Sequence, residues 1–281
     1  LLPVRANLEG FSTLSIGLMG GAYFFGFTLG CLRGSPLLRR VGHIRVFAAM
    51  TAAASAVPLL HALWVETWLW WVLRFMTGYC FAVLYVVIES WLNEQATNEN
   101  RGAVFSAYTL ITLTVLAVGQ QMLLLYDPQQ MQLFAIASAI VSLAAIPVVL
   151  SVAPTPRHAE GKVRLNLKRL FGTSRAGSLG CLAAGLANGS FWALAPVFVA
   201  GYSSDVSLAA WFMTSAVLGG AVGQWPLGLW SDRVDRRWVI AFAGATGLLV
   251  GITIWLAFKV ISPLVLMLLG ACWGAVAFPV Y

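Results

Sequence analysis

The sequence predicts an all-α membrane protein built as a bundle of two related halves. Of its 281 residues, 60% are hydrophobic and only 10% are charged, which leaves too little polar surface to cover a soluble particle of this size. Apolar segments of about 20 residues, long enough to cross roughly 30 Å of hydrocarbon as helices, recur along the chain with short breaks. A basic pattern recurs at two places in the chain, which indicates an internal duplication.

Nine apolar spans follow one another, and each is predicted to form one membrane-crossing helix. They cover residues 12–32, 44–63, 67–92, 102–125, 131–152, 176–200, 206–229, 238–258 and 263–281. We expect both ends of the chain to be cut. Leu1 is not an initiator Met, residues 1–4 fit the tail of an earlier helix, and Tyr281 lies inside the last span.

The repeated pattern is a basic turn that follows an apolar span. The second copy covers residues 228–237, and the first, a degraded copy, covers residues 34–45. Overlaying Arg40 on Arg233 also aligns two glycines in each preceding span. These pairs are Gly26 and Gly30 in the first copy and Gly219 and Gly223 in the second. Small residues let helices approach, so we expect these glycines to permit close helix contact rather than to bind a ligand.

The net charge of +7 is explained by membrane topology. The basic residues lie beside the spans rather than on one continuous face, which argues against nucleic acid as a partner. If the turn at 34–43 is cytoplasmic, 14 of the 17 lysines and arginines fall on cytoplasmic segments, as in the positive-inside bias. The loops at 34–43, 94–101, 153–175 and 230–237 are therefore predicted to share the cytoplasmic side.

A polar, basic stretch divides the chain into two domains. We predict an N-terminal helical half at 1–152, a cytoplasmic linker at 153–175 and a C-terminal helical half at 176–281. The linker either forms a short amphipathic helix on anionic head groups or is a solvated connection whose charges set the topology.

The second basic turn carries a specific spacing of residues. Asp232 is placed to stabilise the N-terminus of the following helix, while the arginines can bind carboxylates or lipid phosphate. Here the chain resembles the major facilitator superfamily, whose inner turn is similar to Gly-x-x-x-Asp-Arg-x-Gly-Arg-Arg. The matching residues are Gly228, Asp232, Arg233, Arg236 and Arg237, with Asp235 in place of the internal Gly. The resemblance implies that this turn is a cytoplasmic gating motif.

The first turn departs further from that pattern. Arg40 and Gly42 match, but Arg39 stands where the superfamily has Asp, which puts the gating role of this turn in doubt. The resemblance covers the entire chain and implies a twelve-helix protein in two six-helix halves. The nine spans would then be helices 2 to 10, with most of helix 1 and all of helices 11 and 12 missing.

The span 67–92 carries two further similarities. Arg74 and Gly78 fit the Arg-x-x-x-Gly motif that the superfamily associates with proton coupling. Residues 85–90, followed by 98–102, look like the YcaD-like branch of transporters, which implies transport without a firm substrate.

One face of this span collects its polar groups. At 100° per residue, Arg74, Gly78, Phe81, Tyr85 and Glu89 fall within about an 80° sector. An intramembrane Arg costs at least about 2.5 kcal/mol near the bilayer centre, so it should face a wet cavity or a partner. We therefore expect these polar groups to line a substrate or proton path.

Each of these polar residues also has a structural interpretation. Arg74 could instead snorkel to the outer head groups. Glu89 could pair with Arg40 or Arg101 rather than carry a proton, and Tyr85 could pack between helices.

Other spans hold further candidates. Asn188 and Trp192 are one helical turn apart and could both face a central cavity; interhelical hydrogen bonding by Asn188 is the alternative. Gln121 needs a hydrogen-bond partner in its apolar span. Several aromatic residues near the outward turns are expected to be interfacial anchors. They are Trp64, Trp68, Trp70, Trp71 and Tyr126.

Taken together, these patterns favour a secondary transporter that moves a small solute by alternating access in an inner or plasma membrane. By resemblance, its site is a central cavity between the halves, and proton coupling is preferred. We see no zinc motif, nucleophile elbow or phosphate-binding loop, so we expect neither an enzyme nor a cofactor. A drug or lipid exporter is the alternative within transport, and a transport-inactive receptor or assembly subunit is the alternative outside it. The oligomeric state and the solute stay open.

Overall fold

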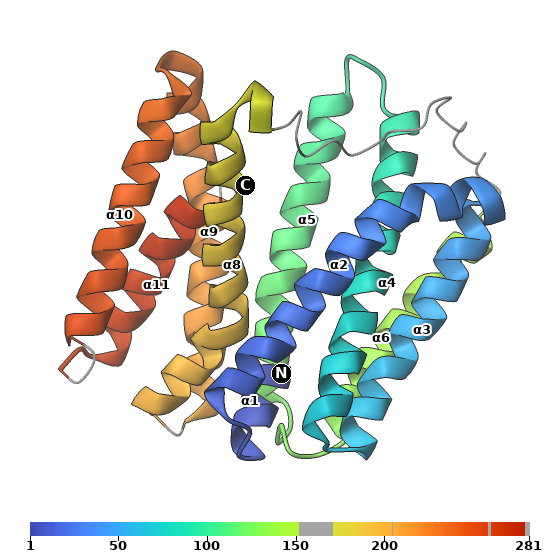
Figure 1. The fold of residues 1–281 in the computed structure, drawn as a ribbon, viewed down its shortest axis with the longest axis horizontal. Coiled ribbons are helices and arrows are strands. Elements are labelled where there is room, and N and C mark those ends of the chain that lie inside the picture. The colour runs from blue at the N-terminus through green and yellow to red at the C-terminus, as the bar shows by residue number, and fades with distance from the viewer. Residues whose placement is uncertain (152–170, 204, 258–259, 279–281) are drawn as a thin grey trace. The chain divides into compact units, whose positions relative to one another are not determined.

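The computed structural model describes residues 1–151, 171–203, 205–257 and 260–278, and the regular elements among these are all helical. The helices, shown in Figure 1, are α1 (Leu2–Leu8), α2 (Thr13–Val41), α3 (His43–Leu63), α4 (Thr67–Gln95), α5 (Arg101–Gln121), the 3₁₀ helix η1 (Met122–Leu124), α6 (Gln132–Val149), α8 (Arg175–Tyr202), α9 (Val206–Arg233), α10 (Arg236–Ala257) and α11 (Pro263–Ala277). Eight of the described helical segments are long and apolar enough to cross a membrane, and α11 is a shorter apolar helix. The predicted fold class is confirmed.

The first basic turn is much shorter than predicted. α2 continues to Val41, and only Gly42 separates it from α3. Gly42 has φ 94°, a backbone conformation that favours glycine. The prediction of a loop at 34–43 is therefore wrong. The helical hydrogen bonds of α2 continue beyond the last residue of the apolar span. Arg39 and Arg40 lie in the last turn of α2, where cations stabilise the exposed carbonyl groups.

The second basic turn is shortened in the same way. α9 continues to Arg233, and only Val234 and Asp235 precede α10. The expected loop at 230–237 is therefore also wrong, and most of it belongs to the two helices. Residues 153–170 of the predicted linker lie outside the described residues, and its last residue, Arg175, belongs to α8 (Arg175–Tyr202).

The chain divides into two compact units, which are described separately here. Unit 1 comprises Leu1–Tyr108 and Tyr126–Lys162, and unit 2 comprises Thr109–Leu125 and Val163–Tyr281, undescribed residues aside. The second part of α5 thus groups with unit 2, although it precedes the linker in sequence. It does so because η1 packs on α9 and the Gln121 amide donates a 2.6 Å hydrogen bond to the Thr214 hydroxyl.

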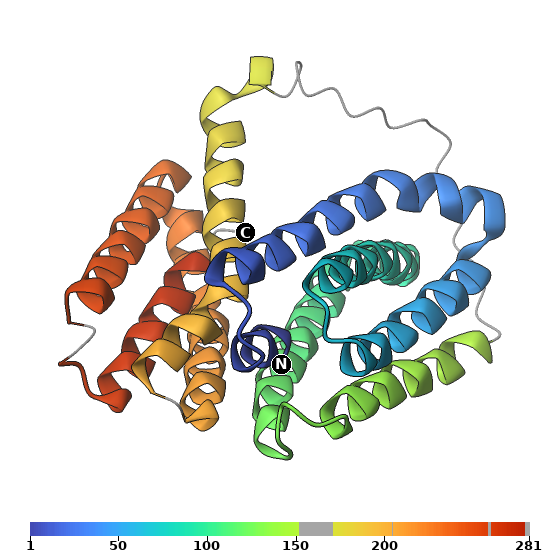
Figure 2. The same ribbon diagram turned by 60° about the horizontal axis from the view of Figure 1, so that its bottom comes forward.

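The main contact in unit 1 is between α2 and α4. A Cβ atom at Gly26 would fall on the backbone carbonyl of Phe75, and a Cβ atom at Gly78 would fall on that of Tyr23. The two helices therefore touch backbone to backbone, which only glycine permits. α3 packs on α4 and along α6, and Figures 1 and 2 both show α3 beside α6.

Unit 2 repeats this contact between α9 and α11. A Cβ atom at Gly219 would fall on the Ala271 carbonyl, and one at Gly274 would fall on the Ala216 carbonyl. Gly219 follows Gly26 by 193 positions, and Gly274 follows Gly78 by 196. The internal duplication is therefore present in the packing as well as in the sequence, and the expected role of the glycines in helix contact is confirmed.

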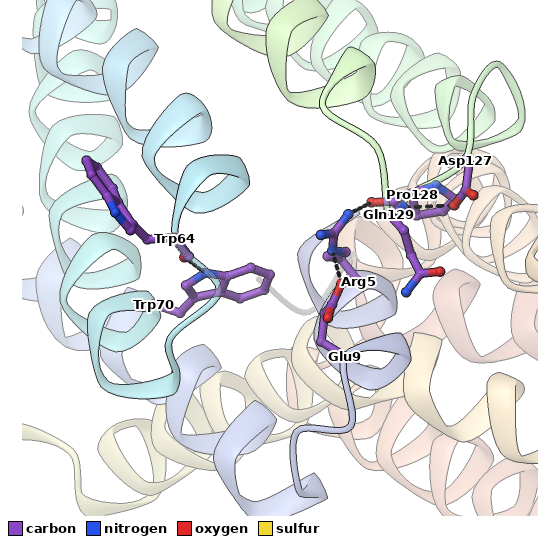
Figure 3. Close-up of polar contacts among 7 residues, drawn as sticks. All are labelled: Arg5, Glu9, Trp64, Trp70, Asp127, Pro128 and Gln129. Carbon is purple, nitrogen blue, oxygen red and sulfur yellow. Dashed lines mark hydrogen bonds and ion pairs between the residues drawn. The ribbon is translucent and has the colours of Figure 1, made fainter.

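The short helix α1 is held by a buried arginine (Figure 3). Arg5 is 8% exposed; its Nε lies 2.8 Å from Glu9 Oε1, and its Nη1 donates a 3.1 Å hydrogen bond to the Pro128 carbonyl. Because a buried charge needs a partner, these contacts attach α1 to the segment before α6.

One of the predicted aromatic anchors, Trp70, is an interior residue, and Trp71 is half-buried. Trp70 is 0% exposed, packs on Phe11 at 5.2 Å between ring centroids, and donates its Nε1 hydrogen to the Trp64 carbonyl at 2.8 Å (Figure 3). Trp71 donates to the Ser15 carbonyl of α2 at 3.1 Å. The predicted interfacial role was therefore wrong for Trp70, because a contact inside the protein supplies its polar partner.

The glycine contact in unit 1 can be tested against an exposed glycine of the same helix. Gly26→Ala should lower the stability of the protein by about 1–3 kcal/mol, because its Cβ forces α2 away from α4. Gly21→Ala should leave it equal or slightly higher, since nothing lies within 4 Å of a Cβ there. Denaturant unfolding in detergent measures both; equal stability of the two variants would contradict the contact.

Candidate functional site

Arg74 is an ionisable group of the spanning helix α4 that lies against α2. Its Cζ lies 4.4 Å from the centroid of the Tyr23 ring on α2, a cation–π arrangement. The Arg74 Nε atom is buried and has no hydrogen-bond partner among the described residues. The guanidinium therefore points at α2 and keeps a buried donor that no described protein group uses.

The glycine contact explains this geometry. Gly78 lies one turn after Arg74 and meets the backbone of α2 at Tyr23. The same close approach brings the Phe27 ring to 6.1 Å from the Tyr85 ring, measured between centroids. α2 and α4 therefore run parallel, and the face of α4 predicted to be polar lies toward α2.

Tyr85 and Glu89 continue this face. Tyr85 is half-buried, and its contact with Phe27 supports the packing interpretation. Glu89 is exposed and interacts electrostatically with Tyr85, with Cys31 on α2 and with Tyr108 on α5.

The alternative that Glu89 pairs with an arginine is not found. In the described part of the chain, Glu89 forms no ion pair with Arg40 or Arg101; the ion pair present there joins Arg5 to Glu9. Glu89 is thus left as an acidic group among tyrosine side chains.

In unit 2, Asn188 is a buried polar group on α8. It is 5% exposed, and its Nδ2 donates a 3.1 Å hydrogen bond to the Ala184 carbonyl one turn earlier. Its Oδ1 is buried and has no partner within the described ranges. In place of the interhelical bond named as the alternative, Asn188 forms a bond within α8, and an unused acceptor remains.

Trp192 belongs to an aromatic cluster that the sequence analysis missed. Its ring stacks on Phe278 with centroids 5.6 Å apart and planes 10° apart. The neighbouring Phe191 stacks on Trp273 at 4.0 Å and 16°. Trp273 and Phe278 lie in the last predicted span, but only the packing of α11 near α8 brings them to Trp192.

The second basic turn differs from its expected chemistry. Asp232 lies in the last turn of α9 and is exposed. Asp235 instead caps α10, because its Oδ1 accepts a 2.9 Å hydrogen bond from the Arg237 backbone N–H. The predicted role of Asp232 at this helix N-terminus was therefore wrong, and the residue that replaces the internal Gly takes it.

The remaining motif residues are solvent-facing. The structure leaves the side chains of the motif arginines exposed, and nothing lies within 4 Å of a Cβ at Gly228. These arginines are Arg40, Arg233, Arg236 and Arg237. They can therefore reach lipid head groups or a mobile partner.

Comparison with known proteins identifies the family. The family model described as Major Facilitator Superfamily matches residues 2–281. The chain belongs to the major facilitator superfamily. The resemblance carried by the basic turn and by Arg74 and Gly78 is thereby confirmed.

Curated relatives of this superfamily member are named as transporters. It is 30% identical over 244 residues to an uncharacterized MFS-type transporter of Enterobacter sp. (strain 638), and 28% identical over 244 residues to YcaD of Escherichia fergusonii. Each match covers 85% of this chain and 63% of the relative. The chain thus spans about 63% of the length of these curated relatives.

A solved structure supports the fold. The nucleoside transporter NupG (D323A mutant) matches with a TM-score of 0.73 and 13% sequence identity, over 99% of this chain and 74% of that one. At this identity the similarity shows the superfamily fold alone. The apolar helices and the family match show that the chain is a multi-pass membrane protein of the major facilitator superfamily.

Proposed function

We propose that this protein is a secondary active transporter that moves a small solute across an inner or plasma membrane by alternating access. The observation that carries the proposal is Arg74, an ionisable group inside a spanning helix whose buried Nε has no described partner. Such groups are costly in a membrane and mark solute or ion pathways. Membership of a family of transporters supports the same conclusion.

The proposed path residues are polar or aromatic groups from both units. They are Arg74, Tyr85 and Glu89 on α4, and Asn188 and Trp192 on α8. Arg74 Nε supplies a donor and Asn188 Oδ1 an acceptor that the described protein leaves unused. A solute that hydrogen-bonds either group would offset the cost of burying that group. Trp192 lies one turn after Asn188 in α8, and its ring stacks on Phe278.

A solute or proton gradient would drive the movement, and no cofactor is needed for it. Proton coupling is the preferred form, because Arg74 and Glu89 lie on the α4 face toward α2. Uptake or efflux by vesicles that contain the full-length protein, with and without a proton gradient, tests transport. A receptor or assembly subunit would move no solute under either condition.

Arg74 variants separate the role of its charge from that of its shape. If charge alone matters, Arg74→Lys should retain transport and Arg74→Gln should lose it. If the planar donor fork matters, both should reduce kcat/KM by about 10- to 100-fold, the value of one hydrogen bond to a charged group. Transport assays across several proton gradients, at equal membrane abundance, measure this. Wild-type transport by both variants would leave only snorkelling as its role.

Asp232 is proposed to set the balance between inward-open and outward-open states, because it keeps the motif position without capping α10. Asp232→Asn removes the charge with little change of shape, so it should alter the accessibility of cysteines in the path and the transport rate. Asp235→Asn is the matched control: asparagine caps a helix about as well as aspartate, so this variant should keep the start of α10 and the transport rate near wild type. Unchanged accessibility and transport in a normally expressed Asp232→Asn variant would refute the gating role.

The cytoplasmic placement of the basic segments predicts which cysteines are protected. In a Cys-free background, single cysteines at Ser35, Thr97 and Ser231 should resist an impermeant reagent in intact cells and react after lysis. A cysteine at Thr155 gives the same test for the linker, which lies outside the described residues. Consistent labelling from outside would reverse the topology.

A further inference from the structure

The two basic turns differ in their charges. Residues 39–45 hold three arginines and no carboxylate, whereas residues 232–238, their counterparts in the duplication, hold three arginines and two aspartates. With neutral histidine, the formal charge of the first turn is thus +3 and that of the second is +1. Between Glu9 and Glu66 the sequence contains no acidic residue, so α2 and α3 supply no carboxylate to the first turn.

The overlay shows which residues of the first turn stand at the positions of the two aspartates of the second turn. Arg39 corresponds to Asp232, and Gly42 corresponds to Asp235. Asp235 places its own carboxylate at the start of α10, whereas no side chain caps the start of α3 in the described structure. The second turn therefore contains carboxylates of its own, whereas residues 39–45 contain none.

Packing holds the first turn so that its arginine side chains lie exposed on the protein surface. Leu38 at the end of α2 and Val46 near the start of α3 are buried against Val83 and Val87 of α4. Arg40 and Arg45 are exposed, and the Val41 side chain beside them is 40% exposed. The turn joins two spanning helices, so it lies at the level of the lipid head groups.

We propose that the first turn, with Arg40 and Arg45 as its main ligands, binds the phosphate group of an anionic phospholipid such as phosphatidylglycerol. Guanidinium groups bind phosphate through paired N–H donors, and the exposed apolar Val41 suits the acyl-chain side of a lipid. The partner is a membrane lipid rather than a soluble phosphate because the turn connects two helices that cross the bilayer and therefore lies beside the lipid head groups. The site goes beyond the transport path and does not depend on which solute is moved.

The test compares matched pairs of arginines in the full-length protein. Phosphatidylglycerol and phosphatidylcholine are titrated into detergent-solubilised protein, and lipid binding is followed by native mass spectrometry. The protein should bind phosphatidylglycerol more tightly than phosphatidylcholine. Arg40→Gln/Arg45→Gln should weaken that binding by about 25-fold, from about 5-fold per arginine at a membrane surface. The matched pair Arg236→Gln/Arg237→Gln, in the turn that carries its own carboxylates, should retain most of it.

Three outcomes would overturn the assignment. Equal losses in both double variants would show a general effect of surface charge, and no loss in the Arg40/Arg45 variant would place the lipid elsewhere. Competition by soluble glycerol 3-phosphate as effective as that of phosphatidylglycerol would show a soluble anion as the ligand. If the double variant does not fold, Arg45→Gln compared with Arg237→Gln makes the same distinction.

Discussion

The backbone contact between paired helices is the constraint on which the arrangement of each unit depends. At Gly26 and Gly78 the absence of a side chain lets α2 and α4 touch along their main chains. In membranes, where water does not drive helices together, such close packing is a principal source of association. The same contact sets the register of the helices, so that Tyr23 meets Arg74 and Phe27 meets Tyr85.

The duplication preserves this contact while the chemistry around it diverges. The position of α11 that corresponds to Arg74 is Gly270, 196 positions later, and a Cβ atom there would meet the Phe212 ring. A cation against an aromatic ring in one half is thus replaced by a glycine beneath an aromatic ring in the other. The backbone contact between the helices depends on the glycines. The residues beside the glycines can therefore differ between the two halves without loss of the contact.

The candidate site could be predicted only in part. The helical face of α4 followed from periodicity, since residues three and four apart lie together on any helix. Asn188 and Trp192 were found as a pair for the same reason. Their surroundings were not, because the stacking of Trp192 on Phe278 joins residues that are far apart in sequence. The cap formed by Asp235 was missed as well, because the predicted start of the helix, residue 238, lies two residues after the start of α10 at Arg236.

The sequence by itself determined the membrane-spanning helices, the duplication and the family. Long apolar segments leave the backbone no other way to satisfy its hydrogen bonds in lipid, and the glycine and arginine spacings survive in both copies. Only the tertiary structure decided where the helices end and which polar groups are paired. Trp70 and Arg5 illustrate the reason: their partners depend on how distant segments pack, and composition alone cannot distinguish a buried, bonded side chain from one at the membrane surface.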